Sequence, residues 1–226
     1  MTASAAPLTL AAVAWNRDAE GQPFFSNAYL EPFTGYFDLR DAFLLGLDID
    51  KETQQWWQNR SEQAKTAITA RPCEPVADVV VGFLDWVREA VAVKQVESLC
   101  LWCQGQDFDV SILRSLCRLF DIRLEEIVPH TSFRDCRTVI LETARIRAVR
   151  LYLKAIAEAE SLNPDGSPVP QPAVLPEEIF VHPSKAYQLF DPLPAEFGNK
   201  DNAHDALYDC RRSSWNVWQA LNYLNQ

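Results

Sequence analysis

The stretch SLCLWCQGQDFDVSIL, residues 98–113, combines the local signals of a buried strand, a turn and a helix. Its first part, SLCLWC (98–103), is a short continuous apolar run, which is typical of a strand buried on both faces in an α/β protein. A turn with Gly105 follows, and FDVSILRSLCRLF (108–120) then has the apolar spacing of a helix. We therefore predict a strand, a turn and a helix, with Asp109 at the strand-to-helix junction, facing a cleft.

Strands and helices are predicted to alternate on both sides of this stretch. LTLAAVAW (8–15) predicts a buried strand, and FFSNAYL (24–30) predicts its antiparallel partner. Asp50 is the expected N-cap of one or two short helices, and Pro75 opens a long helical pattern. Residues 133–154 predict a short strand followed by a basic helix. The apolar residues that we expect on the buried faces of the helices are Val79, Phe83, Trp86, Val87, Ala90, Phe108, Ile112, Leu116 and Phe120.

This order of elements predicts a mixed α/β layer architecture in a single domain over residues 1–226. An irregular proline-rich excursion is expected at about residues 162–197. The 226 residues are 48% hydrophobic and 23% charged, which is the composition of a folded protein. Apolar runs stay shorter than the roughly 18 residues that a membrane span needs, so we expect a cytoplasmic protein with no membrane partner.

Charge and cysteine content restrict the functions that are possible. The net charge of -10 excludes a general electrostatic attraction for nucleic acid, so local basic residues or metal ions would have to offset the acids. The six cysteines are predicted to be reduced and packed rather than paired. Cys100 and Cys103 form a CxxC pair, but a zinc site needs a second ligand pair at suitable spacing, so packed strand residues are the better interpretation.

A second short segment, HDALYDC (204–210), opens the last predicted helix. Taken alone, His204 and Asp209 predict a helix cap and a surface acid, and Asp109 alone predicts a carboxylate favoured by a helix N-terminus. Together, an Asp at a strand-helix junction followed by a His and an Asp spaced five apart resemble the second and third motifs of the DEDDh 3′-5′ exonucleases. ETQQWWQNRSEQAK (52–65) and RDCRT (134–138) also resemble segments of the short phage and bacterial members.

The resemblance implies a ribonuclease-H-like fold and a 3′-5′ exonuclease that acts on ends of single-stranded RNA or DNA. By resemblance, Asp109 and Asp209 would bind Mg²⁺ or Mn²⁺ in a two-metal site, and His204 would act as the general base on the attacking water. Trp56 and Trp57 cannot share one helix face, so one of them is expected to be exposed and available for base stacking.

The family's first motif, an Asp-x-Glu on the central strand, is not found, because LTLAAVAW aligns with the strand that follows it. Its loss would remove two of four metal carboxylates and leave strand edges unpaired. Three explanations remain open. Met1 could be an internal methionine of a longer chain, the protein could be a degenerate exonuclease used as a nucleic-acid or protein binding module, or LTLAAVAW could be the central strand, with acids such as Glu20 or Glu31 completing the site. An unrelated α/β chemistry is the further possibility.

Overall fold

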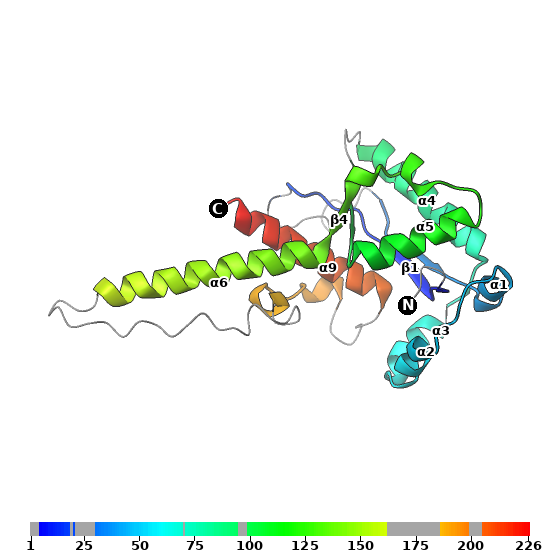
Figure 1. Cartoon of the computed structure of the whole chain (residues 1–226), viewed down its shortest axis with the longest axis horizontal. Coiled ribbons are helices and arrows are strands. Elements are labelled where there is room, and N and C mark those ends of the chain that lie inside the picture. The colour runs from blue at the N-terminus through cyan, green and yellow to red at the C-terminus, as the bar shows by residue number, and fades with distance from the viewer. Residues whose placement is uncertain are drawn as a thin grey trace. The chain divides into compact units, whose positions relative to one another are not determined.

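The computed structural model describes residues 5–18, 20, 30–69, 71–94, 99–161, 186–198 and 205–226. Contacts divide the chain into two compact units, Met1–Cys136 with Leu193–Trp215, and Arg137–Pro192 with Asn216–Gln226. Each unit combines parts that are distant in sequence, so the single domain over residues 1–226 stays a prediction. The mixed α/β class is confirmed by the helices and the small sheets (Figure 1).

The first unit contains two two-stranded sheets. Strand β1 (Thr9–Ala12) pairs antiparallel with β2 (Phe33–Tyr36), and β3 (Leu101–Cys103) pairs parallel with β4 (Phe133–Asp135). The sequence predicts β1, β3 and β4 but not β2, because Pro32 and Gly35 weaken its strand pattern. The partner strand predicted at 24–30 lies outside the described residues, apart from Leu30.

Five helices of the first unit follow the predicted order. They are α1 (Leu39–Leu44), α2 (Lys51–Gln58), α3 (Glu62–Thr69), α4 (Val76–Lys94) and α5 (Ser111–Arg118). Helix α4 begins directly after Pro75, as predicted. Asp50 is the N-cap of α2, and its carboxylate accepts hydrogen bonds from the Thr53 backbone N–H at 2.8 Å and the Thr53 hydroxyl at 2.7 Å. Short 3-10 turns of the first unit also lie at Leu124–Glu126, His130–Ser132 and Ala195–Phe197.

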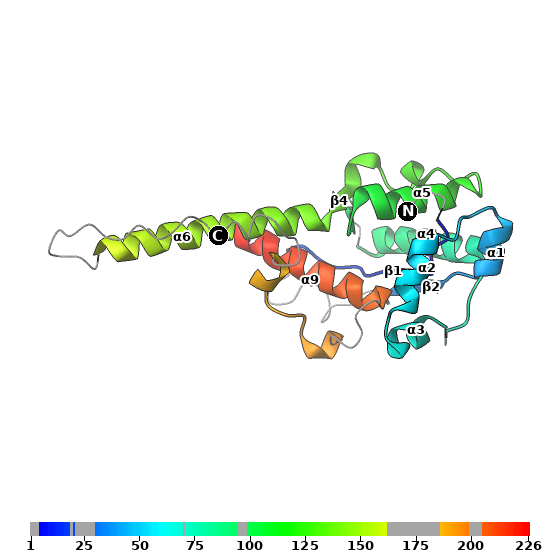
Figure 2. The same ribbon diagram turned by 60° about the horizontal axis from the view of Figure 1, so that its bottom comes forward.

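The core of the first unit lies along α4, which packs against β2 and α5 (Figures 1 and 2). Four of the predicted α4 core residues are buried, and Trp86 is half-buried with its indole N–H donating to the Glu31 carbonyl at 2.7 Å. Gly35 of β2 makes the closest approach, because a Cβ there would lie 2.5 Å from Val79 Cγ1. The buried α4 residues from this predicted set are Val79, Phe83, Val87 and Ala90.

Two predictions around the 98–113 stretch are wrong. Strand β3 is half-buried along its length, rather than buried on both faces, because it has only β4 as a strand neighbour among the described residues. Phe108 is 44% exposed rather than packed. It lies in a π-helical turn, Gln106–Val110, and this wider winding rotates Phe108 off the face on which Leu113, Leu116 and Cys117 of α5 are buried.

The second unit contains most of α6 (Cys136–Ser161) and the last part of α9 (Ala206–Leu224), with a short turn at Tyr187–Leu189. Arg147 donates to the Leu189 carbonyl, and the guanidinium groups of Arg147 and Arg150 lie 5.9 and 5.0 Å from the centre of the Tyr223 ring. The basic helix predicted within residues 133–154 is therefore confirmed. Two of its arginines, Arg147 and Arg150, make contacts inside this unit. Within the described residues, every helix is too short or too polar to cross a membrane.

Candidate active site

Asp109 lies where the 98–113 stretch predicts, between β3 and α5, in the π-helical turn. Its carboxylate folds back on the loop that leaves the strand. The Oδ2 atom accepts the backbone N–H of Gln104 at 2.8 Å and that of Gly105 at 3.2 Å. The backbone N–H of Asp109 in turn donates to the Gly105 carbonyl at 2.9 Å. These bonds hold the carboxylate in one orientation at the end of the strand.

A third acidic residue, Asp135, lies at the same sheet edge, and the sequence reasoning did not single it out. Asp135 ends β4 and is the register partner of Cys103, the last residue of β3. Its Oδ2 atom accepts the backbone N–H of Gln106 at 3.4 Å. The signal that would have found it is its place at the end of a strand parallel to β3, because carboxyl ends of neighbouring parallel strands meet at one edge.

Asp209 lies in the first turn of α9. Asp205 caps this helix, since its Oδ1 atom accepts the backbone N–H of Tyr208 at 3.0 Å. The Asp209 carbonyl accepts the Ser213 hydroxyl at 2.7 Å, and the Asp209 carboxylate lies 3.8 Å from the Arg212 guanidinium. The prediction of an Asp in the opening turns of the last helix is confirmed, whereas its chemical role stays a prediction.

The carboxylates of both predicted aspartates influence the pKa of one thiol, that of Cys210. Removal from water, together with the carboxylates of Asp209, Asp109 and Asp205, raises the pKa of Cys210 to about 12, and desolvation is the largest of these causes. A carboxylate disfavours a thiolate only when it lies close to it. The hydrogen bond from Gln104 Nε2 to the Ser213 hydroxyl brings the β3–α5 junction and the start of α9 together, although Asp109 and Asp209 are separated in sequence by the whole of α6.

The same thiol also connects α9 to strand β1. Cys210 Sγ donates to the Ala11 carbonyl at 3.2 Å. The Leu8 carbonyl accepts from Phe37, so alternate residues of β1 face β2 and the Ala11 carbonyl points to the opposite edge. Within the part of the chain that the structure describes, β1 has β2 as its one strand neighbour. The described residues therefore do not give β1 the two neighbours that the central-strand explanation requires.

Cys103 and Cys136 complete a set of thiols around the acidic edge. Desolvation, the largest cause, together with the carboxylates of Asp109 and Asp135 raises the pKa of Cys103 to about 12. Burial also raises the pKa of Cys136. The raised pKa values favour the neutral thiols at physiological pH. All six cysteines are free, as predicted, but Cys73 and Cys100 are exposed rather than packed.

Whether the described residues suit a divalent cation depends on how many ligands the protein must supply. Across the described ranges, no group of three or more His, Cys, Asp or Glu side chains could hold a metal ion. Mg²⁺, however, is usually held by one or two carboxylates together with waters and substrate phosphates. Asp109 and Asp209 fit that smaller requirement.

His204, the predicted general base, lies outside the described residues, directly before the Asp205 cap of α9. The two acids named for the central-strand explanation, Glu20 and Glu31, are both exposed. The Glu31 carbonyl accepts the Trp86 indole N–H. The structure gives Glu31 a packing contact with α4 through its backbone and gives neither glutamate a described contact with Asp109 or Asp209.

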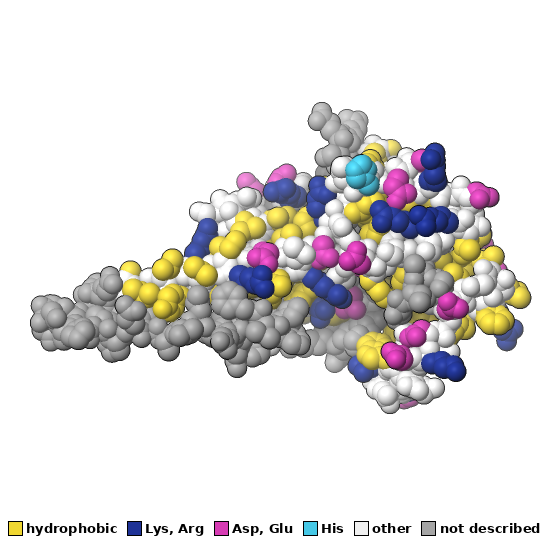
Figure 3. Space-filling model, viewed as in Figure 1, with side chains coloured by type: hydrophobic (Ala, Val, Ile, Leu, Met, Phe, Trp, Pro, Cys, Tyr) yellow, Lys and Arg dark blue, Asp and Glu magenta, His cyan; other side chains and the backbone are white. Residues whose placement is uncertain are grey.

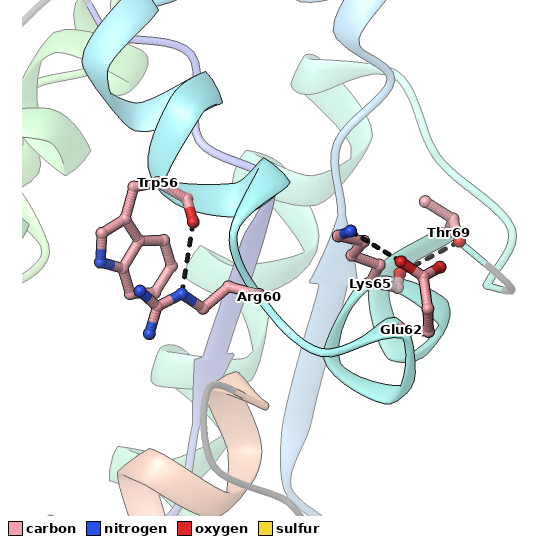
Figure 4. A network of polar contacts seen from close by, with 5 residues as sticks. All are labelled: Trp56, Arg60, Glu62, Lys65 and Thr69. Atoms are coloured by element: carbon pink, nitrogen blue, oxygen red, sulfur yellow. Dashed lines mark hydrogen bonds and ion pairs between the residues drawn. The ribbon is translucent and has the colours of Figure 1, made fainter.

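The exposed tryptophan expected on α2 is Trp56, which is 40% exposed. Its ring meets Trp57 edge-on at 5.1 Å, and the Arg60 guanidinium lies over it at 4.2 Å from the ring centre. Figure 4 shows Arg60 also donating to the Trp56 carbonyl, beside a separate Glu62–Lys65 ion pair and the Thr69 hydroxyl bond on α3. Trp56 is therefore an exposed aromatic surface with a cation already stacked on it.

Charge on the visible face of the molecule is mixed. Figure 3 shows acidic and basic side chains interspersed over this face rather than gathered into one basic field. Several arginines are paired with acids on their own or neighbouring helices, as in Arg114 with Glu125 at 2.6 Å and Arg88 with Asp85 at 2.6 Å. The drawn surface thus agrees with the expectation from a net charge of -10.

Comparison with known proteins gives one match. A family model described as the 3′-5′ exoribonuclease Rv2179c-like domain matches residues 2–161. This range includes Asp109, Asp135 and the Trp-Trp helix, whereas Asp209 and the rest of α9 lie beyond it. No curated protein and no solved structure gives a significant match.

Proposed function

Because the chain belongs to the 3′-5′ exoribonuclease Rv2179c-like family, we propose that it is a metal-dependent 3′-5′ exoribonuclease acting on the ends of single-stranded RNA. The observation that supports this most directly is the chain of hydrogen bonds from the Asp109 carboxylate through Gln104 to Ser213, which in turn donates to the Asp209 carbonyl. A carboxylate held after a parallel strand and a second one in the first turn of another helix could supply the hard oxygen ligands that a Mg²⁺-dependent phosphodiesterase needs. We also propose that the sheets belong to a ribonuclease-H-like arrangement.

In this proposal Asp109 and Asp209 hold Mg²⁺ or Mn²⁺. When bound, such an ion polarises a phosphoryl oxygen and lowers the pKa of a bound water. The backbone N–H groups of Gln104 and Gly105 fix the Asp109 carboxylate before any ion arrives. Several carboxylates at one edge of a protein with net charge -10 would repel RNA, and a divalent cation offsets that repulsion.

The proposed chemistry is hydrolysis of the terminal phosphodiester. Water forms a new bond to phosphorus while the bond from phosphorus to the 3′ oxygen of the preceding nucleotide breaks, releasing a nucleoside 5′-monophosphate. His204 takes the proton from the attacking water, a role that suits a side chain titrating near neutral pH. The 3′ oxygen leaves with a proton from solvent.

The cytoplasm is the proposed compartment, since thiols stay reduced there and all six cysteines are free.

A second candidate is a catalytically degenerate member that binds RNA or a protein without cleaving it. The observation that favours it is that the described residues contain no group of three or more potential metal ligands. This alternative predicts that the Asp209→Asn variant retains the binding of single-stranded RNA. The exoribonuclease proposal predicts that the same substitution abolishes digestion, because the amide cannot replace the negative charge.

The deciding experiment is digestion of 5′-labelled single-stranded RNA by the full chain in Mg²⁺ or Mn²⁺, read on a denaturing gel, with single-stranded DNA in parallel. We expect a ladder that shortens from the 3′ end on RNA and stops on addition of EDTA. Asp109→Asn, Asp209→Asn and His204→Ala should each reduce the rate by at least about a hundredfold.

Asp107→Asn is the matched control, because Asp107 lies in the same π-helical turn as Asp109 but its side chain is exposed. It changes the same charge in the same loop and should leave the digestion rate unchanged. Digestion that survives in Asp109→Asn and Asp209→Asn, or that persists in EDTA, would refute the proposed roles. A wild-type chain that binds RNA but does not shorten it would establish the binding module instead.

A further inference from the structure

Gln104 links the two segments that carry the site aspartates. It follows β3 directly, and its backbone N–H donates to Asp109 Oδ2 at 2.8 Å. Its side-chain amide reaches in the other direction, where Nε2 donates to the Ser213 hydroxyl of α9. The two residues are 109 positions apart in sequence, so this contact is a true tertiary link. Gln104 therefore contacts the Asp109 carboxylate with its backbone and the Asp209 helix with its side chain.

Ser213 carries the link on to Asp209. Its hydroxyl is part of a side chain only 5% exposed, and it donates to the Asp209 carbonyl at 2.7 Å, one helical turn earlier. A hydroxyl has a single hydrogen, so once that hydrogen is used the oxygen can only accept, which is what the Gln104 amide requires. Each group therefore donates to the next: the Gln104 amide to the Ser213 hydroxyl, and the Ser213 hydroxyl to the Asp209 carbonyl.

We propose that Gln104 and Ser213 are positioning residues that set the separation between the Asp109 carboxylate and the first turn of α9. This inference rests on the proposed function, in which Asp109 and Asp209 bind one divalent cation together with the RNA phosphate. Neither Gln104 nor Ser213 touches the cation. They act by fixing where the two carboxylates stand, because groups that orient metal ligands are worth about 10- to 100-fold in metal affinity.

Other contacts of Asp209 are weaker candidates for this role. The Arg212 guanidinium lies 3.8 Å from the Asp209 carboxylate, and both side chains are more than a third exposed. Such an exposed ion pair contributes little to positioning. A buried hydroxyl that accepts an amide from another element is a firmer restraint, since breaking it leaves a polar group without its partner.

The test measures Mn²⁺ binding by the full chain directly, from the electron paramagnetic resonance signal of free Mn²⁺. We expect Gln104→Ala and Ser213→Ala each to weaken Mn²⁺ binding about 10- to 100-fold. The double variant should be no weaker than the worse single variant, because both substitutions break the same link. The concentration of Mn²⁺ that half-saturates RNA digestion should rise by the same factor, while the KM for RNA at saturating Mn²⁺ stays unchanged.

Ser214→Ala is the matched control. Ser214 neighbours Ser213 on α9, is similarly buried at 8% exposure, and makes the equivalent bond to the Cys210 carbonyl at 2.8 Å. The loss of a buried hydroxyl is therefore the same in both variants, but only Ser213 accepts from Gln104. Thermal melts of all variants separate a loss of folding from a loss of metal binding. We expect Ser214→Ala to bind Mn²⁺ as the wild type does.

Failure of this inference can be told apart from failure of the proposed function. If the wild type binds Mn²⁺ and digests RNA while Gln104→Ala and Ser213→Ala bind Mn²⁺ equally well, the positioning role is overturned and the proposed function stands. If the variants bind Mn²⁺ more weakly but the wild type digests no RNA, the positioning role stands and the proposed function fails. A wild type that binds no Mn²⁺, or an equal loss in Ser214→Ala, overturns the positioning role.

Discussion

Replacing Gly35 with alanine should destabilise the first unit through a single steric contact. An added Cβ would lie 2.5 Å from Val79 Cγ1 and 3.3 Å from both Val79 Cγ2 and Phe33 Cζ. Val79 is 2% exposed and lies on α4, so it cannot turn into solvent to relieve the overlap. The strand or the helix must move instead, and both belong to the core that supports the acidic edge.

The expected magnitude follows from this geometry. Overpacking a core by one methyl group costs about 1 to 3 kcal/mol. For a chain of this length, each kcal/mol lowers the melting temperature by about 2 to 4 °C, so Gly35→Ala should lower it by about 2 to 12 °C. Val79→Ala removes the two clashing methyl groups and on its own should cost about 1.6 kcal/mol for the lost burial, plus a cavity term.

Urea and thermal denaturation followed by circular dichroism will measure these effects. The double variant Gly35→Ala with Val79→Ala should be more stable than the sum of the single effects predicts, by about 1 kcal/mol or more. Gly82→Ala is the matched control, because a Cβ there comes no closer than 3.5 Å to Phe33, and alanine is favoured over glycine inside a helix. It should leave stability unchanged or raise it. A neutral Gly35→Ala, or strict additivity in the double variant, would refute the steric explanation.

Three further outcomes are expected. Asp50→Ala removes the N-cap of α2 and should lower the free energy of unfolding by about 0.5 to 2 kcal/mol, measured in urea. At pH 8 a thiol-reactive dye should modify the exposed Cys73 and Cys100 quickly and the buried Cys136 only on unfolding, as a stoichiometry with and without urea will show. Burial and neighbouring carboxylates raise the pKa of Cys210 from 9.0 to about 12, so its contribution to stability is complete below pH 9 and is lost as the pH rises towards 12; urea midpoints at pH 8 and pH 10 should differ in that direction.

The parts of the fold that could be predicted are those with local physical signals. Pro75 fixes the backbone at a helix start, and α4 begins at the next residue. Asp50 competes for backbone N–H groups as a cap, and it caps α2. The apolar run before Gly105 and the helical pattern after it placed Asp109 at the junction of β3 and α5. Each of these signals lies within a few residues of the feature that it determines.

The features that could not be predicted depend on tertiary contacts or on backbone winding. Strand β2 contains Gly35, which weakens its strand pattern but is required by the approach of α4. The exposure of Phe108 follows from a π-helical turn, and a pattern based on 3.6 residues per turn cannot detect such a turn. The bond between Gln104 and Ser213 joins residues 109 positions apart, which no local spacing reveals.

The backbone N–H groups of the loop after β3 are already hydrogen-bonded to carboxylates, which bears on how this loop could bind a phosphate. The three successive backbone N–H groups of Gln104, Gly105 and Gln106 are directed at the carboxylates of Asp109 and Asp135. In many α/β proteins a glycine-containing loop of this kind leaves its N–H groups open and cradles a phosphate with them. Here the carboxylates of Asp109 and Asp135 already accept these N–H groups. An RNA phosphate arriving at this edge would meet negative charge rather than amide hydrogens, so under the proposed function a cation would stand between protein and substrate.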